Sequence, residues 1–192
     1  MLIAKAVTLL GLVVLSGIVS CASVATPLQP VAQVDLSRYL GRWYVIAMIP
    51  TRVERAAYNA VETYSRNPDG TICTWYRFRT GSENSPVKLI RSTAAVVPGT
   101  GNAAWSVHMY WLLRLQYLVG WLKPDYSQVL VVRDKRDHLW YMAREPQVSE
   151  VDLDAMRMRA RSMGYDVSRI VYVPQRWPER GAGSNTFPEQ CP

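Results

Sequence analysis

Gly41-Arg42-Trp43-Tyr44-Val45-Ile46-Ala47-Met48-Ile49 is the stretch of this chain that decides its fold. It opens on a Gly-x-Trp motif and continues as an apolar, strand-like run. A second such run, residues 139–144, ends on Arg144 about a hundred positions later. Short strand-like runs separated by turn residues lie between them. We therefore predict one closed antiparallel barrel in which Arg144 lies across the Trp43 indole and seals one end.

The strand-like runs are rich in β-branched and aromatic residues, and turn residues such as Asn67-Pro68-Asp69-Gly70 separate them. We predict strands over residues 43–49, 59–66, 71–80, 87–97, 103–111, 115–122, 127–133 and 139–144. Eight strands without intervening helices indicate an all-β fold, an eight-stranded up-and-down antiparallel barrel. The chain of 192 residues suffices for one such domain with a substantial core.

The apolar period changes after the eighth predicted strand. Ser149 is a candidate N-cap, and apolar residues then recur at helical spacing: Leu153, Met156, Ala160 and Met163. We predict a helix over residues 149–163 that packs on the outside of the barrel, with a partner-binding helix as the alternative. A short ninth strand is expected at residues 170–173, and residues 176–192 are expected to form an irregular tail.

The N-terminal segment has the pattern of a secretory signal. Lys5 is the only charge in residues 1–20, and the apolar run is too short to span a membrane. The sequence before Cys21, Leu-Ser-Gly-Ile-Val-Ser, resembles the lipobox of bacterial lipoproteins, in which the cysteine becomes the lipidated N-terminus. We therefore predict a signal peptide over residues 1–20, a lipid anchor on Cys21 followed by a tether to residue 34, and a barrel domain over residues 35–175. An ordinary signal peptide is the alternative.

Two further cysteines, Cys73 and Cys191, remain in this chain. In an oxidising compartment disulfides persist, and a bond between these two would pin the tail to the barrel wall. Closing so long a loop is worth about 3–5 kcal/mol. Two free thiols are the alternative.

The formal charge is +7, or +6 without Lys5. The basic residues are scattered, which is typical of a solvated surface, although a basic surface also suits contact with anionic lipid. No basic helix or interleaved basic–aromatic face points to nucleic acid.

Three motifs in register resemble the lipocalins, most closely their bacterial outer-membrane lipoproteins and the apolipoprotein D-like branch. The stretch from Gly41 to Tyr44 matches the first signature, and Arg144 matches the third. Pro124-Asp125-Tyr126 matches the second, with proline where threonine is usual. The resemblance covers residues 34–175 and implies a calyx for small apolar or amphipathic molecules. For the bacterial branch it implies fatty acids and lysophospholipids as ligands, in envelope maintenance.

The residue after the lipidated cysteine bears on the membrane that holds the anchor. An aspartate at this position retains lipoproteins of enteric bacteria on the inner membrane, and this chain has Ala22 instead. Ala22 therefore favours a lipid anchor in the outer membrane, on its periplasmic face.

Side chains alternate along a strand, so parity predicts the lining of the calyx. If Trp43 and Arg144 both face inward, the residues inside on the first and last strands are Val45, Ala47, Ile49, Trp140 and Met142. If Cys73 faces outward to bond the tail, Thr74, Tyr76 and Phe78 face inward. On the fifth and sixth strands we expect an inward face made of Trp105, Val107, Met109, Trp111, Tyr117, Val119 and Trp121.

From this lining we take the candidate ligand-binding residues: Tyr76, Phe78, Trp105, Val107, Met109, Tyr117, Val119, Trp140 and Met142. The head group of an amphipathic ligand is expected at the rim, near Tyr76, Tyr117, Arg77, Arg79 and Arg114. The alternative is a solid interior filled by the same side chains.

Two other functions use the same scaffold. An isomerase-type enzyme would need a thiol nucleophile such as Cys73, and a porphyrin carrier would need an axial ligand such as His108, which parity turns outward. The only other histidine is His138, and no triad or metal cluster is visible. We therefore predict a binding protein with no catalytic residue, metal or cofactor, and a homodimer is left open.

Overall fold

The computed structural model describes residues 26–109, 113–181, 183–184, 186–188 and 190–191. The predicted signal peptide, the lipid anchor on Cys21 and the predicted inward position of Trp111 lie outside these residues. None of the helices in the described part of the chain has the length and hydropathy needed to cross a membrane.

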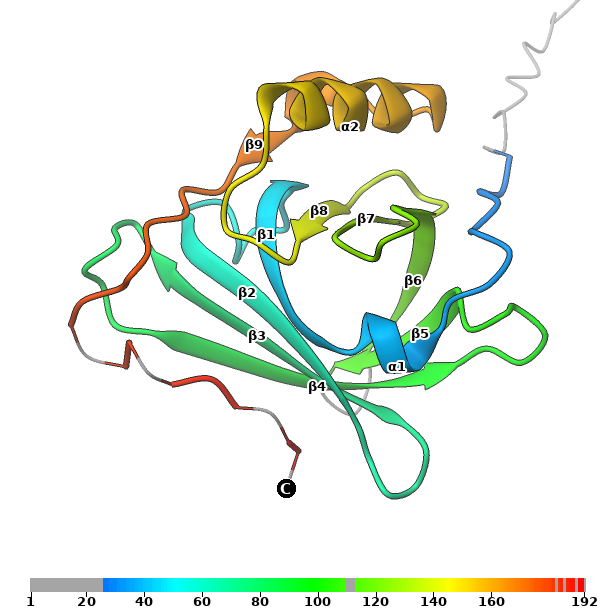
Figure 1. Ribbon diagram of the computed structural model, residues 1–192, viewed down its shortest axis with the longest axis horizontal. Coiled ribbons are helices and arrows are strands. Elements are labelled where there is room, and N and C mark those ends of the chain that lie inside the picture. Colours follow the sequence, from blue (N-terminus) through cyan, green and yellow to red (C-terminus); the bar gives the residue numbers. More distant parts are fainter. Residues whose placement is uncertain (1–25, 110–112, 182, 185, 189, 192) are drawn as a thin grey trace, which may run out of the picture.

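Eight antiparallel strands close into a barrel, as predicted (Figure 1). Each strand pairs with its neighbour in the chain, and β1 pairs with both β2 and β8, which closes the sheet. The strands are β1 (Gly41–Ile49), β2 (Ala57–Arg66), β3 (Ile72–Thr80), β4 (Lys88–Val96), β5 (Ala104–Met109), β6 (Leu113–Leu122), β7 (Gln128–Val132) and β8 (Leu139–Ala143).

The predicted helix is α2 (Glu150–Ser162), which lies outside the barrel over β1, β7 and β8 (Figure 1). The Ser149 side chain accepts a hydrogen bond from the Asp152 amide and caps the helix as predicted. Met156 and Ala160 are buried against the outer face of the sheet. A 3₁₀ turn, η1 (Val167–Arg169), leads to β9 (Val171–Tyr172), the predicted ninth strand, which pairs with the second half of β1.

The closed end of the barrel is built as predicted from Trp43 and Arg144. The Arg144 guanidinium carbon lies 3.8 Å from the Trp43 ring centroid. Its NH groups donate to backbone carbonyls at 2.6–3.0 Å, those of Arg38, Tyr39, Leu40 and Arg42. Most of these carbonyls belong to α1 (Leu36–Tyr39) and its cap, so the third signature motif secures this short helix across the barrel floor. Gly41 has a φ of +93°, which a side chain would strain.

The second signature motif meets the same helix. Asp125 accepts hydrogen bonds from the Ser127 amide and hydroxyl at 2.9 and 2.6 Å, which closes the turn before β7. The Tyr126 hydroxyl accepts from the Asp35 amide, the N-cap of α1, and the Arg38 guanidinium lies 4.0 Å from the Tyr126 ring. All three signature motifs therefore converge on α1.

Bulges in two strands overturn part of the predicted parity. The β1–β8 register shifts between Val45 and Ala47, and the β6–β7 register shifts between Val119 and Trp121. A bulge moves every later side chain to the other face. The inward predictions for Ala47, Ile49 and Trp121 are therefore wrong: these residues lie in the outer cluster beneath α2, and Met48 faces inward instead.

The predicted bond between Cys73 and Cys191 is present and ties the tail to the outer wall. The outward residues of β3 all hold this tail. The Trp75 indole donates to the Gln190 carbonyl at 2.9 Å, and Arg77 and Arg79 form ion pairs with Glu179. The expectation that Arg77 and Arg79 reach the rim is therefore wrong, because both point outward and are buried under the tail.

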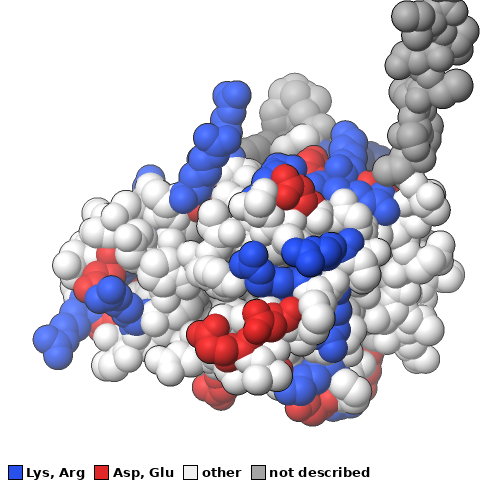
Figure 2. Space-filling view, turned by 90° about the horizontal axis from the view of Figure 1, so that it is seen from above, with Lys and Arg blue, Asp and Glu red and all other residues white. Residues whose placement is uncertain are grey.

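Charge is dispersed on the face that carries α2. Basic side chains on this face are interspersed with acidic ones and separated by uncharged residues (Figure 2). This dispersal agrees with the scattered basic residues of the sequence.

Candidate functional site

A cavity of about 110 Å³ lies inside the barrel, above the closed end. Its wall is mostly apolar and aromatic and comes from every strand between β2 and β8. The predicted ligand-binding residues that line it are Tyr76, Val107, Met109, Tyr117 and Trp140. The remaining ones belong to the interior core without lining the cavity: Phe78, Trp105, Val119 and Met142. The barrel is therefore hollow, although part of the predicted lining is packed core.

Three phenol groups meet at the closed end of the cavity, where Tyr64 and Tyr117 line it and Tyr39 packs against them in the core. The hydroxyls of Tyr39 and Tyr117 are 2.5 Å apart, and Tyr117 donates to the Tyr64 hydroxyl at 3.1 Å. The Tyr117 ring stacks on Trp105 with centroids 4.5 Å apart. Burial raises the pKa of Tyr64 and Tyr117, so both phenols are uncharged. Tyr117 was expected at the rim, and the structure places it at the bottom instead.

Glu62 and Tyr76 form a polar pair halfway up the wall. They are directly opposite each other on β2 and β3, and both side chains are buried. The Glu62 Oε2 atom and the Tyr76 hydroxyl have no hydrogen-bond partner among the described residues. Burial raises the pKa of Glu62 well above its ordinary value, and the nearby Glu54 raises it further. Burial therefore favours the protonated, uncharged form of Glu62.

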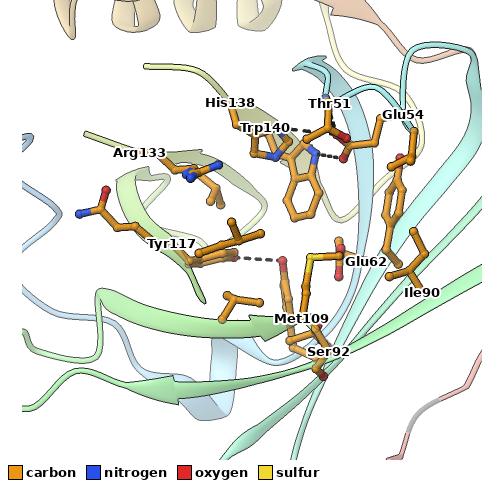
Figure 3. A pocket seen from close by; sticks show the side chains of 18 residues that line it. Thr51, Glu54, Glu62, Ile90, Ser92, Met109, Tyr117, Arg133, His138 and Trp140 are labelled. Carbon is orange, nitrogen blue, oxygen red and sulfur yellow. Dashed lines mark hydrogen bonds and ion pairs between the residues drawn. The ribbon is translucent and has the colours of Figure 1, made fainter. Parts of the chain in front are cut away.

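Glu54, Trp140 and His138 form a second polar group at the mouth (Figure 3). Glu54 Oε1 accepts from the Trp140 indole at 3.0 Å, and Oε2 accepts from the Thr51 amide at 2.7 Å. His138 Nδ1 lies 3.7 Å from Glu54 Oε2. Burial lowers the pKa of His138 more than Glu54 raises it, so the imidazole is neutral near pH 7.

Arg133 is the only cationic side chain among the described residues that line the cavity. It directly follows β7, at the open end, and its guanidinium is 3.5 Å from the Asp137 carboxylate. Its Nε has no hydrogen-bond partner in the described part of the chain. Arg114, which was expected at the rim, is exposed and does not line the cavity.

Sequence reasoning missed the polar residues of the cavity. Glu62 had a usable signal, because it alternates along β2 with Ala60 and Tyr64, which face the interior of the barrel. Arg133 had the same signal, because it ends the strand predicted over residues 127–133 and alternates with Val129 and Val131, which face the interior. Glu54 lies in a connection, where no periodicity assigns a direction. The sequence around His138 has no feature that points to Glu54.

The residues that the two alternative functions would need, Cys73 and His108, do not line the cavity. Cys73 is bonded to Cys191 and faces outward, so it does not offer the thiol nucleophile that the enzyme alternative would need. His108 is exposed and shares a hydrogen bond with Ser106 on the outer face. Within the described ranges, no group of three or more His, Cys, Asp or Glu side chains is arranged to hold a metal.

The barrel resembles solved structures of low sequence identity. Insecticyanin from the tobacco hornworm Manduca sexta superposes with a TM-score of 0.63 at 14% identity, over 82% of this chain and 89% of that one. Lobster apocrustacyanin A1 superposes with a TM-score of 0.57 at 13% identity, over 73% and 79%. These likenesses concern the fold alone.

Sequence relatives are closer. The Escherichia coli K12 protein named outer membrane lipoprotein Blc is 31% identical, over 82% of this chain and 90% of its own length. Temperature-induced lipocalin-1 of Arabidopsis thaliana is 29% identical, over 84% and 89%. The family model described as a lipocalin-like domain matches residues 34–175. With the three signature motifs joined at the closed end, these matches establish that the chain belongs to the lipocalin-like family.

Proposed function

We propose that this chain is a lipid-anchored lipocalin of the outer membrane that binds fatty acids or lysophospholipids in its cavity. It would face the periplasm and store or move lipids in envelope maintenance. The anchor on Cys21 is supported by the lipobox-like sequence and by relatives named outer membrane lipoprotein. The observation that carries the binding function is the apolar cavity with a single cationic side chain, Arg133, among its described lining residues.

The geometry favours entry of the acyl chain first. Each buried CH₂ contributes roughly 0.8 kcal/mol, and the apolar part of the wall offers Val107, Met109 and Leu115 to it. A cavity of about 110 Å³ is small for a long chain, because pockets that enclose whole drug-sized ligands span roughly 300–1,000 Å³. The remainder of the chain and its acidic head would therefore lie in the mouth, beside Arg133.

Titration of delipidated protein with a long-chain fatty acid, and separately with a lysophospholipid, tests this function. Because Trp140 lines the cavity, we expect a saturable change in tryptophan fluorescence that shrinks in Trp140→Phe. Arg133→Gln should weaken the fatty acid several-fold, whereas Arg161→Gln on the exposed face of α2 should not. Absence of a saturable change with every amphiphile would overturn the proposal.

The anchor is tested separately from the cavity. Cys21→Ala should release the protein from the outer membrane into the soluble periplasmic fraction, because a protein without acyl chains has no durable hold on lipid. Ligand affinity of the purified domain should not change. Retention of Cys21→Ala in the membrane fraction would contradict the lipid anchor.

A further inference from the structure

Four residues that line the cavity, Glu62, Tyr76, Arg133 and His138, have a buried polar atom without a hydrogen-bond partner among the described residues, and the atoms of Glu62 and Tyr76 belong to neighbouring strands. Glu62 Oε2 and the Tyr76 hydroxyl are both buried, and neither has a hydrogen bond within the described residues. Native proteins pair almost all their buried polar groups, so an exception calls for a physical reason. A ligand that supplies the missing bonds is such a reason, because both atoms belong to residues that line the cavity.

The two side chains are arranged to meet one ligand group. Glu62 and Tyr76 are cross-strand neighbours on β2 and β3, so their Cβ atoms are about 4.5–5.5 Å apart on the same face. Tyr76 is held in place by ring stacking, with centroids 4.6 Å from Phe78 and 5.6 Å from Trp140. Phe78 does not touch the cavity but positions the phenol that does.

The charges around this pair decide which ligand group fits. Ionisable side chains that line the cavity are Glu54, Glu62, Tyr64, Tyr76, Tyr117, Arg133 and His138. The phenols and His138 are neutral, and Arg133 already lies near the Asp137 carboxylate. Two carboxyl groups, Glu54 and Glu62, therefore dominate the wall. Glu54 opposes an anionic head that enters first, and Glu62, whose uncharged form burial favours in the free protein, can ionise beside a group that donates hydrogen bonds or carries positive charge.

We propose that Glu62 and Tyr76 form an internal subsite for a hydrogen-bond donor of an amphipathic ligand, above all the ammonium group of a long-chain amine. The inference rests on the proposed function, because it concerns the same cavity. Acids bind with the head at the mouth, and amines bind with the nitrogen inside. When the ammonium binds, Glu62 gives up its proton to solvent and the resulting carboxylate pairs with the nitrogen. The Tyr76 oxygen accepts a second N–H.

Competition of dodecylamine, dodecanol and dodecanoic acid against a fluorescent fatty-acid probe tests the subsite, because the three ligands share one alkyl length. In the unaltered protein the amine should bind tightest. Glu62→Gln should weaken the amine about tenfold or more, since hydrogen bonds to charged groups are the strong ones, and should leave the acid unchanged or tighter. Tyr76→Phe should weaken the amine and the alcohol several-fold. Glu145→Gln removes an exposed carboxylate as a matched control.

Calorimetry in buffers of different ionisation enthalpy gives an independent readout. Binding of the amine should release about one proton per ligand, and Glu62→Gln should abolish the release while its unfolding transition stays cooperative. The subsite is overturned if the amine binds no tighter than the acid, or if Glu62→Gln leaves the affinity for the amine unchanged. Failure of every ligand to displace the probe, or of the probe to bind, would instead overturn the proposed function.

Discussion

At the scale of single residues, Arg144 couples the end of β8 to α1. One planar guanidinium covers the Trp43 indole and also donates to backbone carbonyl groups at the end of the barrel. A lysine would keep the charge but would lose the stacked plane and the rigid fork of donors. The interaction is therefore specific to arginine rather than to positive charge.

Arg144→Lys should lower the free energy of unfolding by about 2–4 kcal/mol, because several charge-assisted bonds to partly buried carbonyls are lost and do not add independently. Urea denaturation followed by circular dichroism measures the loss. Arg161→Lys, on the exposed face of α2, makes the same exchange and should change the stability by less than about 0.5 kcal/mol. Equal effects of the two exchanges would show that the guanidinium stack contributes nothing.

Glu179 predicts how stability depends on pH. Burial raises its pKa, but hydrogen bonds from Arg77, Arg79 and Asn59 outweigh this and lower the pKa to about 2, from 4.5. As the pH falls, the Glu179 carboxylate is therefore protonated at a higher pH in the unfolded chain than in the folded one. Its contribution to the free energy of unfolding is complete above pH 4.5 and is lost as the pH falls through about 2.

Glu179→Gln should flatten the acid limb of an unfolding profile between pH 2 and 4.5. It should also cost about 3–5 kcal/mol at neutral pH, because Arg77 and Arg79 would remain buried without a carboxylate. Glu150→Gln, at the exposed start of α2, serves as the control. An unchanged acid limb in Glu179→Gln would contradict the assignment.

At the scale of elements, the strands and α2 followed from local chemistry, but two bulges did not. Turn residues and helical spacing mark where each element begins and ends, and those signals are local. A bulge depends on how two strands fit each other, so Ala47, Ile49 and Trp121 were assigned to the wrong face. Gly120 was the available hint, because an isolated glycine within a strand often marks a bulge.

Gly120→Ala tests the bulge in β6. A Cβ at this position would lie 2.6 Å from Val132 Cγ2 and 3.2 Å from Cγ1, in the neighbouring strand. We expect a loss of about 1–3 kcal/mol, as for other overpacked sites, in urea unfolding. Val132→Ala should recover part of that loss in the double variant, so that the two changes cost less together than their sum. If the losses in the free energy of unfolding are strictly additive, the clash between the added Cβ and Val132 is relieved by movement elsewhere.

At the scale of the whole molecule, the inner and outer faces of β3 have different tasks. Its inward residues Thr74 and Tyr76 line the cavity, whereas Cys73, Arg77 and Arg79 fix the C-terminal tail. Parity predicted the inward residues once Cys73 was taken to face outward, whereas Arg77 and Arg79 were expected at the rim. It did not predict the ion pairs with Glu179, because the tail has no periodic pattern and its position depends on contacts far apart in sequence. Glu54, in the connection between β1 and β2, escaped prediction because it too has no periodic pattern, whereas parity does place Glu62 and Arg133 inside.

The disulfide and the ion pairs with Glu179 are two of the attachments that hold the tail, and removing them one at a time separates their contributions. Cys73→Ala/Cys191→Ala should cost about 3–5 kcal/mol, because the bond closes a loop between residues 118 positions apart. The ion pairs with Glu179 should still hold residues before 180 against β3, so limited proteolysis should cut only beyond them. Adding Glu179→Gln should expose the whole tail from residue 176 to cleavage, while the probe still binds in the cavity, on the opposite face of β3. Loss of ligand binding in parallel with tail release would mean that the two faces of the strand are not independent.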